Sequence, residues 1–302
     1  MRPVHEGIIS CHYAQVNVLI ALSDDTFVSA SRDGTLKLWD IRTAMCIKTF
    51  IGHSGPVYGI AKINDGRFIS CAGDQMEKPT ARLWDLDSGV CLRKYIGHTE
   101  AVTSVIKMSD SIFVTVSSDV TANVWNLQKG RHMHSFQGSS ADGFISAARV
   151  NDEIFVATNE KSVLFVWNIH TFHHLHTISA VALQARPIIH RYNNHTFLAS
   201  SGGGELKQWN VNTGNCVGTF NIAANTAQIA WLNGNFFLCA SETHNILELF
   251  NVRTGVSVLT LRVDHPVSSV TRINEVTFLV GHHNGTARLW KVPGDCLTER
   301  AA

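Results

Sequence analysis

The fold is decided by a short stretch near the amino terminus, Phe27–Asp40, which reads FVSASRDGTLKLWD. Apolar and polar side chains alternate over its last residues, a pattern typical of a β-strand, and an Asp-Gly turn signal precedes them. The closing aromatic residue recurs along the whole chain, at Trp39, Trp84, Trp125, Trp167, Trp209, Phe250 and Trp290. Successive members are 45, 41, 42, 42, 41 and 40 residues apart. The chain is therefore built from seven copies of one unit.

A second series of aromatic residues supports the same period. About twelve residues before each of these closing aromatic residues (the aromatic slot), a Phe opens a short apolar run. These residues are Phe27, Phe68, Phe113, Phe155, Phe197, Phe237 and Phe278. Each unit reads as four short antiparallel strands joined by Asn, Asp and Gly turns. One such sheet cannot bury both of its faces, so the units must stack. The sequence predicts an all-β, seven-bladed β-propeller of four-stranded antiparallel blades, forming a single domain over residues 1–302.

Composition excludes several classes of protein. The 302 residues carry 25 Lys and Arg against 24 Asp and Glu, so no overall field attracts a nucleic acid or an acidic membrane. Apolar runs fall far short of the ~18 residues of a spanning helix, and the amino terminus lacks a signal peptide. Seven cysteines without a Cys-x-x-Cys pair indicate a reducing compartment. We expect a cytoplasmic protein that binds no nucleic acid and inserts into no membrane.

The units resemble those of the WD-repeat family, whose blades carry Gly-His before the inner strand, Ser or Thr in the second strand, Asp in the next turn, and Trp-Asp. The first three blades match this pattern at His12, Ser29, Asp33 and Trp39, at His53, Ser70, Asp74 and Trp84, and at His98, Thr115, Asp119 and Trp125. This His can donate one ring proton to the Asp and accept a proton from the hydroxyl. The resemblance implies three structural tetrads that tie turns to strands.

Blades four to seven depart from the family pattern. The residues at or next to the Asp position are Glu160, Gly203, Thr243 and Asn284. We expect these blades to be held more by packing and less by polar tetrads.

Closure of the propeller is expected from the amino-terminal segment. Val4–Ile9 leads into Cys11-His12 as Cys46–Phe50 leads into Gly52-His53, so it is an outer strand without a blade of its own. Pairing it with the seventh blade would remove exposed strand edges. Cys296-Leu297 competes for this role, and Val4–Ile9 is favoured because it has more apolar residues to complete a half-buried sheet face.

Sixteen histidines invite a search for metal and catalytic sites. His174 and His176 share one strand face, but a structural metal site needs four ligands and a catalytic one three. The Ser, His and Asp of the tetrads resemble a hydrolase triad, yet they recur in three blades, whereas a nucleophile needs one exposed copy. The sequence contains no phosphate loop, nucleophile elbow or dinucleotide fingerprint. We expect no enzyme activity, no metal and no cofactor.

The remaining functions are binding functions. The family resemblance implies a non-catalytic scaffold that binds protein or peptide partners and assembles a multiprotein complex. One alternative is the substrate-recognition subunit of a ubiquitin-ligase assembly, and another is a propeller that binds polyanions. Family members that recognise phosphorylated segments have a cluster of arginines around the upper mouth of the central channel. In this sequence Arg32 alone adds a charge at that mouth. The ubiquitin-ligase alternative is therefore disfavoured.

One turn of the second blade is longer than its counterparts. Asp74 and Trp84 are ten residues apart, whereas the matching residues of blades one and three are six apart. Loops that exceed the repeat length tend to lie on a binding face. We predict a partner-binding site on the upper face, formed by Asn17, Arg32, Tyr58, Gln75, Met76, Glu77 and Lys78. The alternative is a tolerated surface insertion, because loop lengthening costs little.

Basic residues fill one column of the repeat where the family usually has an apolar residue. They stand six residues before the strand-opening Phe, at Lys62, Lys107, Arg149, Arg191 and Arg272. We predict that they form a partial collar around the lower channel mouth. Local pairing is the favoured explanation of these charges, because an acidic residue lies three positions downstream of four of them, at Asp65, Asp110, Asp152 and Glu275. The functional alternative is that they bind an anion such as an inositol phosphate or an acidic peptide.

Overall fold

The computed structural model describes residues 4–138, 142–179, 188–202, 204–222, 226–233, 235–241, 244–293 and 296. These residues form seven four-stranded antiparallel sheets, with no α-helix among them. The fold is a seven-bladed β-propeller, as the sequence predicted. The chain divides into two compact units, residues 1–50 with 221–302 and residues 51–220. The expectation of a single domain stays a prediction.

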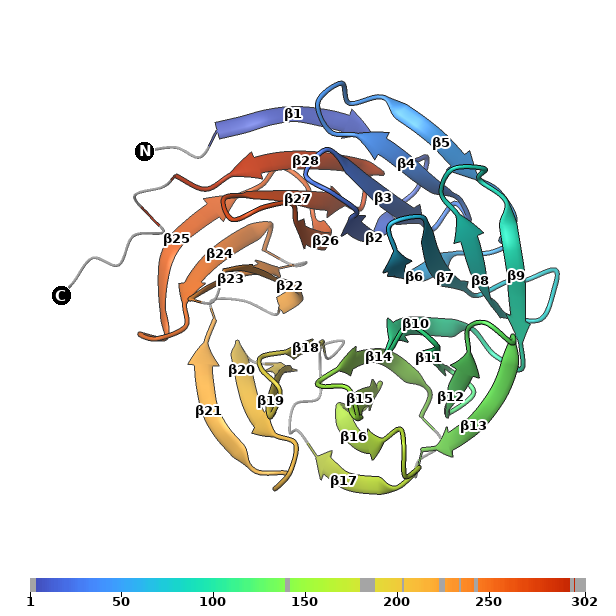
Figure 1. Cartoon of the computed structure of the whole chain (residues 1–302). Helices are drawn as coiled ribbons and strands as arrows, with labels where there is room; N and C mark the ends of the chain where they lie inside the picture. Colours follow the sequence, from blue (N-terminus) through green and yellow to red (C-terminus); the bar gives the residue numbers. More distant parts are fainter. Residues whose placement is uncertain are drawn as a thin grey trace. The chain divides into compact units, whose positions relative to one another are not determined.

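The first unit holds blades 1, 6 and 7 (Figure 1). Blade 1 consists of β2 (Val16–Ala21), β3 (Thr26–Ser31), β4 (Leu36–Asp40) and β5 (Cys46–Phe50). Blade 6 consists of β22 (Thr226–Asn233), β23 (Phe236–Ser241), β24 (Ile246–Asn251) and β25 (Val256–Arg262). Blade 7 consists of β26 (Val267–Arg272), β27 (Thr277–His282), β28 (Thr286–Lys291) and β1 (Val4–Ser10).

The second unit holds blades 2 to 5. Blade 2 consists of β6 (Val57–Asn64), β7 (Arg67–Ala72), β8 (Thr80–Asp85) and β9 (Cys91–Ile96). Blade 3 consists of β10 (Val102–Lys107), β11 (Ile112–Ser117), β12 (Thr121–Asn126) and β13 (Arg131–Gln137). Blade 4 consists of β14 (Phe144–Arg149), β15 (Ile154–Asn159), β16 (Val163–Asn168) and β17 (His174–Ser179). Blade 5 consists of β18 (Ile189–Arg191), β19 (Thr196–Gly202), β20 (Glu205–Asn210) and β21 (Cys216–Asn221).

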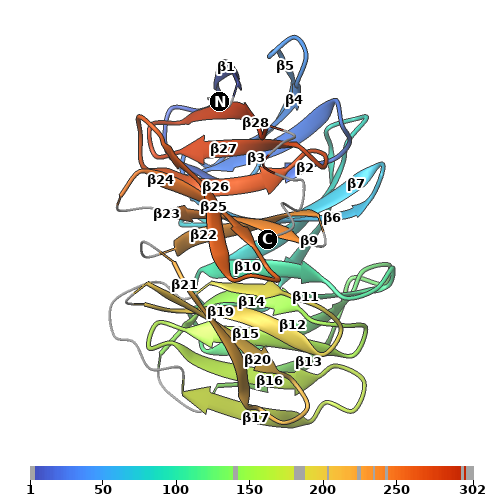
Figure 2. The same ribbon diagram turned by 90° about the vertical axis from the view of Figure 1, so that its left-hand side faces the viewer.

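The amino-terminal strand completes blade 7. β1 pairs antiparallel with β28, with Val4 opposite Lys291, and the two strands lie side by side in Figures 1 and 2. Ile9 is 5% exposed and belongs to the apolar core shared by blades 7 and 1. Closure by the amino-terminal strand is thereby confirmed. Cys296 belongs to no strand, and Leu297 lies outside the described residues.

Each blade contains the same aromatic cross-strand pair. The strand-opening Phe lies directly opposite the aromatic slot of the next strand, in the pairs Phe27–Trp39, Phe68–Trp84, Phe113–Trp125, Phe155–Trp167, Phe197–Trp209, Phe237–Phe250 and Phe278–Trp290. The rings of the first pair are stacked with their centroids 6.2 Å apart. The two aromatic series of the sequence are thus the two members of one pair, which the pleated sheet holds in register.

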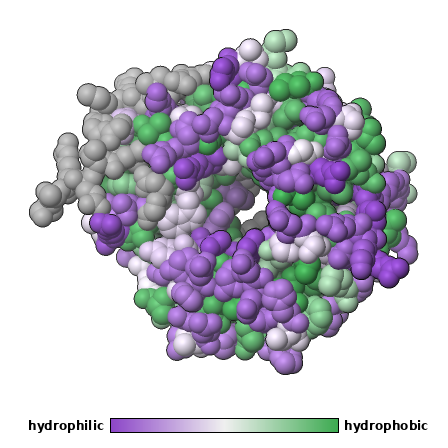
Figure 3. Space-filling view, viewed as in Figure 1, coloured by the Kyte–Doolittle hydropathy of each residue, from purple (hydrophilic) through white to green (hydrophobic). Residues whose placement is uncertain are grey.

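The apolar cores lie between neighbouring blades of each unit. One core joins blades 2 and 3 and includes Val102 and Trp125, and another joins blades 6 and 7 and includes Leu247 and Phe278. On the face of the second unit seen in Figure 3, hydrophilic residues predominate and hydrophobic ones are interspersed among them. Among the described residues, no helix is long and apolar enough to cross a membrane.

Blade 7 replaces the polar tetrad by apolar packing. Val263 occupies the position of the tetrad His, because it lies four residues before β26 as His12 lies four residues before β2. Val280 occupies the position of the tetrad Ser, because it lies two residues after Phe278 as Ser29 lies two residues after Phe27. Val263 and Val280 share one core with Trp290. Gly203 and Thr243, two of the divergent positions in other blades, lie outside the described residues.

Candidate functional site

In blade 2, four side chains form a chain of hydrogen bonds. Trp84 Nε1 donates to Ser70 Oγ over 2.8 Å, the Ser70 hydroxyl donates to His53 Nε2 over 2.7 Å, and His53 Nδ1 donates to Asp74 over 3.2 Å. The same chain of bonds links Trp39, Ser29, His12 and Asp33 in blade 1, and Trp125, Thr115, His98 and Asp119 in blade 3. In each of these three blades, the structure therefore brings together the four side chains that the family pattern named.

The tetrads have the connectivity of a hydrolase triad without its accessibility. Ser70 is fully buried, and its hydroxyl oxygen accepts the Trp84 indole proton. A nucleophilic oxygen must reach a substrate carbonyl and give up its proton to the His. The burial of Ser70 prevents this approach, and the hydrogen bonds of the tetrad tie the turn that holds Asp74 to the strand that holds Ser70.

The tetrad carboxylates are held in their charged form. Burial acts to raise the pKa of Asp74, but hydrogen bonds from His53 and Thr80 outweigh it and hold this pKa well below its usual range. Asp33 and Asp119 show the same direction for the same reason. Burial also lowers the pKa of His53, against the opposing effect of Asp74. A neutral His that donates to a charged Asp satisfies both buried groups.

The long turn of blade 2 leaves the tetrad intact. Thr80 Oγ1 donates to Asp74 Oδ2 over 2.6 Å, as Thr35 Oγ1 donates to Asp33 Oδ1 over 2.6 Å in blade 1. Thr80 thus occupies the position of Thr35, although it follows its Asp by six residues instead of two. Residues 75–79 form a loop inserted between Asp74 and Thr80, which correspond to Asp33 and Thr35 of the short turn in blade 1.

This loop is anchored by a partly buried ion-pair network. Glu77 Oε2 lies 3.2 Å from Arg82 Nη2 and 2.8 Å from Lys94 Nζ. The Arg82 side chain is 3% exposed, and a Cβ at Gly52 would lie only 2.7 Å from its Nη1. The Met76 amide also donates to Ser54 Oγ over 3.3 Å. These bonds fix the path of the loop while its outer side chains stay in solvent.

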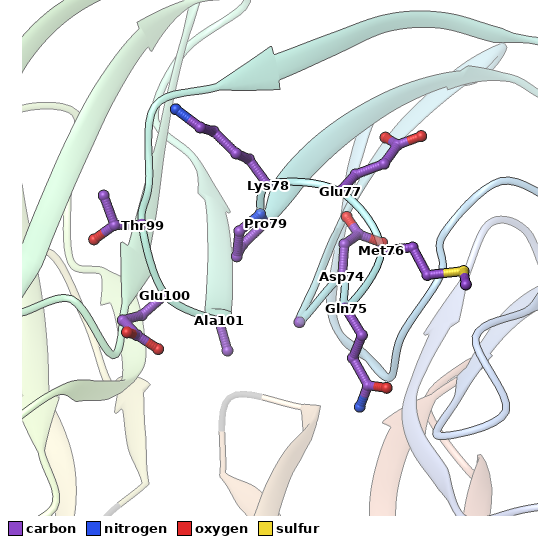
Figure 4. A pocket seen from close by; sticks show the side chains of 10 residues that line it. Asp74, Gln75, Met76, Glu77, Lys78, Pro79, Thr99, Glu100 and Ala101 are labelled. Carbon is purple, nitrogen blue, oxygen red and sulfur yellow. The ribbon is translucent and has the colours of Figure 1, made fainter.

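An open cavity of about 600 Å³ lies between this loop and the first turn of blade 3 (Figure 4). Its wall consists of Gly73, Asp74, Gln75, Met76, Glu77, Lys78, Pro79, Thr99, Glu100 and Ala101. The volume falls in the range of ligand pockets, about 300–1,000 Å³. Met76 is 90% exposed, and Lys78 and Glu100 are also exposed. We take this cavity as the candidate binding site.

The predicted upper-face residues are divided between the two units. Gln75, Met76, Glu77 and Lys78 line the cavity. Tyr58 belongs to the same unit, and its ring lies close to Gly73, one of the wall residues. Asn17 and Arg32 belong to the first unit, so their part in a common site stays a prediction.

Sequence reasoning missed the blade 3 side of the cavity. Thr99 and Glu100 follow the Gly97-His98 pair, and analysis of a single repeat gives no reason to single them out. These residues could have been found from their place in the repeat, because the turn after His98 belongs to blade 3, which packs against blade 2.

The predicted lower-face bases form one structural column. Each lies directly opposite the strand-opening Phe of its blade, namely Lys62, Lys107, Arg149, Arg191 and Arg272. Three of them form ion pairs within their own turns, with Asp65, Asp110 and Asp152. Lys107 Nζ also donates to the Ile63 carbonyl of blade 2 over 2.6 Å. Local pairing is thus present for these three bases, and anion binding stays a prediction.

Comparison with known proteins relates the first three blades to a known family. The family model described as "WD domain, G-beta repeat" matches residues 3–40, 44–85 and 89–126. Each matched segment starts with the outer strand of one blade and continues through the first three strands of the next. Residues 3–126 thus contain three WD repeats. This register also explains closure, because the outer strand of the first WD repeat is β1, which completes blade 7.

Several named proteins are similar to short parts of this chain. Nuclear distribution protein PAC1-2 of Uncinocarpus reesii is 50% identical over 54 residues, which are 18% of this chain and 12% of that protein. E3 ubiquitin-protein ligase COP1 of Pisum sativum is 33% identical over 76 residues, 25% of this chain and 11% of that protein. U3 small nucleolar RNA-associated protein 12 of Saccharomyces cerevisiae is 45% identical over 42 residues, 14% and 4% of the two chains. The matches thus span only a small part of each relative.

Proposed function

We propose that this protein is a non-catalytic WD-repeat scaffold that assembles a multiprotein complex, and that a protein partner docks at the cavity between the long blade 2 loop and blade 3. The observation that carries the proposal is the anchoring of this loop. Glu77 holds it through Arg82 and Lys94, while Met76 and Lys78 are left in solvent. A loop fixed before binding loses little conformational entropy when a partner docks.

Several observations support protein partners over other ligands. In blade 2 the side chains of Ser70, His53 and Asp74 are buried in the tetrad, which supports a non-catalytic role. The net charge of +1 gives no overall attraction for a nucleic acid. A cytoplasmic location, inferred from the free cysteines among the described residues, is part of the same proposal.

The second candidate is a substrate-recognition role in a ubiquitin-ligase assembly. The similarity of 76 residues to a protein named E3 ubiquitin-protein ligase COP1 favours it. Such a role would use the same docking surface, with the partner then acting as a substrate. The two candidates differ in outcome, because only a substrate gains ubiquitin and turns over faster when this chain is present.

The test is a loop excision that copies blade 1. Replacing Gln75–Pro79 by one Gly, together with Arg82→Lys, gives blade 2 the turn Asp-Gly-Thr and the Lys that blade 1 has at Lys37. Both the wild-type protein and the variant are tagged, expressed in the native cell, and compared by quantitative mass spectrometry of co-purified proteins.

We expect at least one partner to be depleted about tenfold or more from the variant, because an anchored loop at the centre of an interface carries much of the binding energy. An unchanged set of partners at unchanged abundance would contradict the proposal. The matched control is Met45→Ser, which alters another exposed Met in the first unit and should leave the partners in place.

A further inference from the structure

The cavity wall carries two exposed side chains of opposite charge, Lys78 on the blade 2 loop and Glu100 on the blade 3 turn. Glu77 is engaged by Arg82 and Lys94, and Asp74 is engaged within its tetrad. Lys78 and Glu100, by contrast, take part in no ion pair within the described part of the chain, and both are exposed. Figure 4 shows Lys78 on the blade 2 loop and Glu100 on the blade 3 turn, apart from each other.

The middle of the cavity offers contacts of a different kind. The Pro79 ring, the Ala101 methyl group and the Met76 thioether provide apolar surface, and the Gln75 amide provides hydrogen-bond donors and an acceptor. Met76 is 90% exposed, and its flexible side chain can adapt to an apolar group of a ligand. The wall therefore combines one cationic group, one anionic group and several apolar contacts.

We propose that this cavity binds an extended peptide segment of the partner, in which one acidic side chain pairs with Lys78 and one basic side chain pairs with Glu100. This inference rests on the proposed docking function and names the chemistry of its ligand. The two charges also fix the direction of the peptide, because reversing it would place like charges together at both ends.

Ligands of a single charge fit this arrangement poorly. A polyanion would meet the ammonium group of Lys78 at one place on the wall and the carboxylate of Glu100 at another. A purely basic segment would be repelled by Lys78. An uncharged apolar segment would leave both charges without partners. A segment with both charges, separated by an apolar residue, complements the whole wall.

The test is a selection from a phage-displayed library of random linear peptides. The library is selected in parallel against the wild-type protein and against the double charge reversal Lys78→Glu with Glu100→Lys. We expect wild-type selection to enrich peptides with one acidic and one basic residue in a fixed order. Selection on the reversed protein should enrich the opposite order.

Binding of the enriched peptides is then measured by fluorescence anisotropy. Each single reversal should weaken binding of a wild-type-selected peptide about tenfold, or about 1.4 kcal/mol, since it loses one ion pair and adds a like-charge contact. The matched controls are Glu160→Lys and Lys129→Glu, two exposed residues of other turns in the same unit. They should leave the affinity unchanged, and all four variants should melt at the wild-type temperature.

The inference is overturned if no enriched peptide depends on Glu100 and Lys78, or if the two proteins enrich peptides without regard to charge order. This outcome is distinguishable from failure of the docking proposal. If loop excision still removes a cellular partner while the charge reversals change nothing, docking stands and the proposed ligand chemistry is wrong. If excision removes no partner, the docking proposal itself fails.

Discussion

Thr80 Oγ1 donates to Asp74 Oδ2 over 2.6 Å across six positions of the chain, the same bond that Thr35 makes to Asp33 across two. An insertion that keeps both of its ends in place adds surface without altering the blade beneath it. This separation of surface from blade makes the loop a candidate site, and it also allows the loop to be removed cleanly.

Loop excision should therefore leave the fold intact. The variant with one Gly in place of Gln75–Pro79 and with Arg82→Lys retains the Asp74–Thr80 bond and no longer needs the Glu77 carboxylate. We expect its melting temperature to stay within a few degrees of the wild-type value, since a shorter loop costs slightly less entropy to close. Thermal unfolding followed by circular dichroism checks this. An aggregated or unfolded variant would show that residues 75–79 hold the blade together.

Glu77→Gln should destabilise the protein through Arg82. The Arg82 guanidinium is 3% exposed and would lose its carboxylate partner, which leaves a buried charge poorly compensated. We expect a lower urea midpoint, and a partial return when Arg82→Met removes the buried charge as well. The control is Glu205→Gln, whose pair with Lys207 lies near the surface. Equal midpoints for Glu77→Gln and this control would contradict the anchoring role.

Ile8 and Ile9 should respond very differently to truncation. Ile9 is 5% exposed within the core of blades 7 and 1, and Ile8 is 52% exposed on the opposite face of β1. We expect Ile9→Ala to cost about 2–4 kcal/mol of unfolding free energy and Ile8→Ala less than about 1. Removal of residues 1–10 should be more severe, because it exposes the edge of β28. Similar losses for the two Ile variants would contradict the closure of blade 7 by β1.

His282 should make the protein less stable in mild acid. Its Nδ1 donates to the His265 carbonyl over 3.1 Å, and burial, assisted by the Arg288 charge, lowers its pKa from 6.5 to about 4. Between these values the unfolded chain binds a proton that the folded chain does not. Stability should therefore fall as the pH falls from 6.5 to 4, by at most about 3 kcal/mol.

The slope should flatten in the variant His282→Ser. Ser31 and Ser117 occupy this position in blades 1 and 3, and each donates to a carbonyl of the preceding turn. Melting temperatures at several pH values measure the effect. Some slope should remain, because burial also lowers the pKa of His190 to about 4. A profile identical to that of the wild type would exclude His282 as a source of the acid sensitivity.

The lower-face bases should bind polyanions weakly while their carboxylate partners are present. We expect inositol hexakisphosphate at low salt to leave the wild-type melting temperature nearly unchanged. The variant with Asp65→Asn, Asp110→Asn and Asp152→Asn should show a larger shift, because it frees the three bases. A clear shift of the wild-type protein that disappears with Lys107→Gln, Arg149→Gln and Arg191→Gln would establish the anion site instead.

The repeat made most of the fold predictable. The Phe and Trp series each mark one position of the pleat, and their direct pairing in all seven blades follows from that shared register. The outer strand Val4–Ile9 could be assigned because the sequence before Cys11-His12 parallels that before Gly52-His53.

The site was predictable only in part. The long turn after Asp74 was visible as a change in spacing. Its anchor was not, because Glu77 meets Lys94 across 17 positions and Arg82 is buried beside Gly52. Glu100 was missed for a similar reason, since the cavity arises from the packing of two blades and a single repeat carries only one of its walls.

Site-specific photocrosslinking shows whether a protein partner contacts the blade 2 loop in the cell. p-Benzoylphenylalanine is introduced in place of Met76 in one variant and in place of Met45, which is 68% exposed, in the other. After irradiation of the native cells, we expect a discrete crosslinked adduct at position 76 that is absent at position 45 and is lost when Glu100→Lys is added. Crosslinks that are absent at both positions, or equal at both, would contradict the assignment of this loop as the docking site.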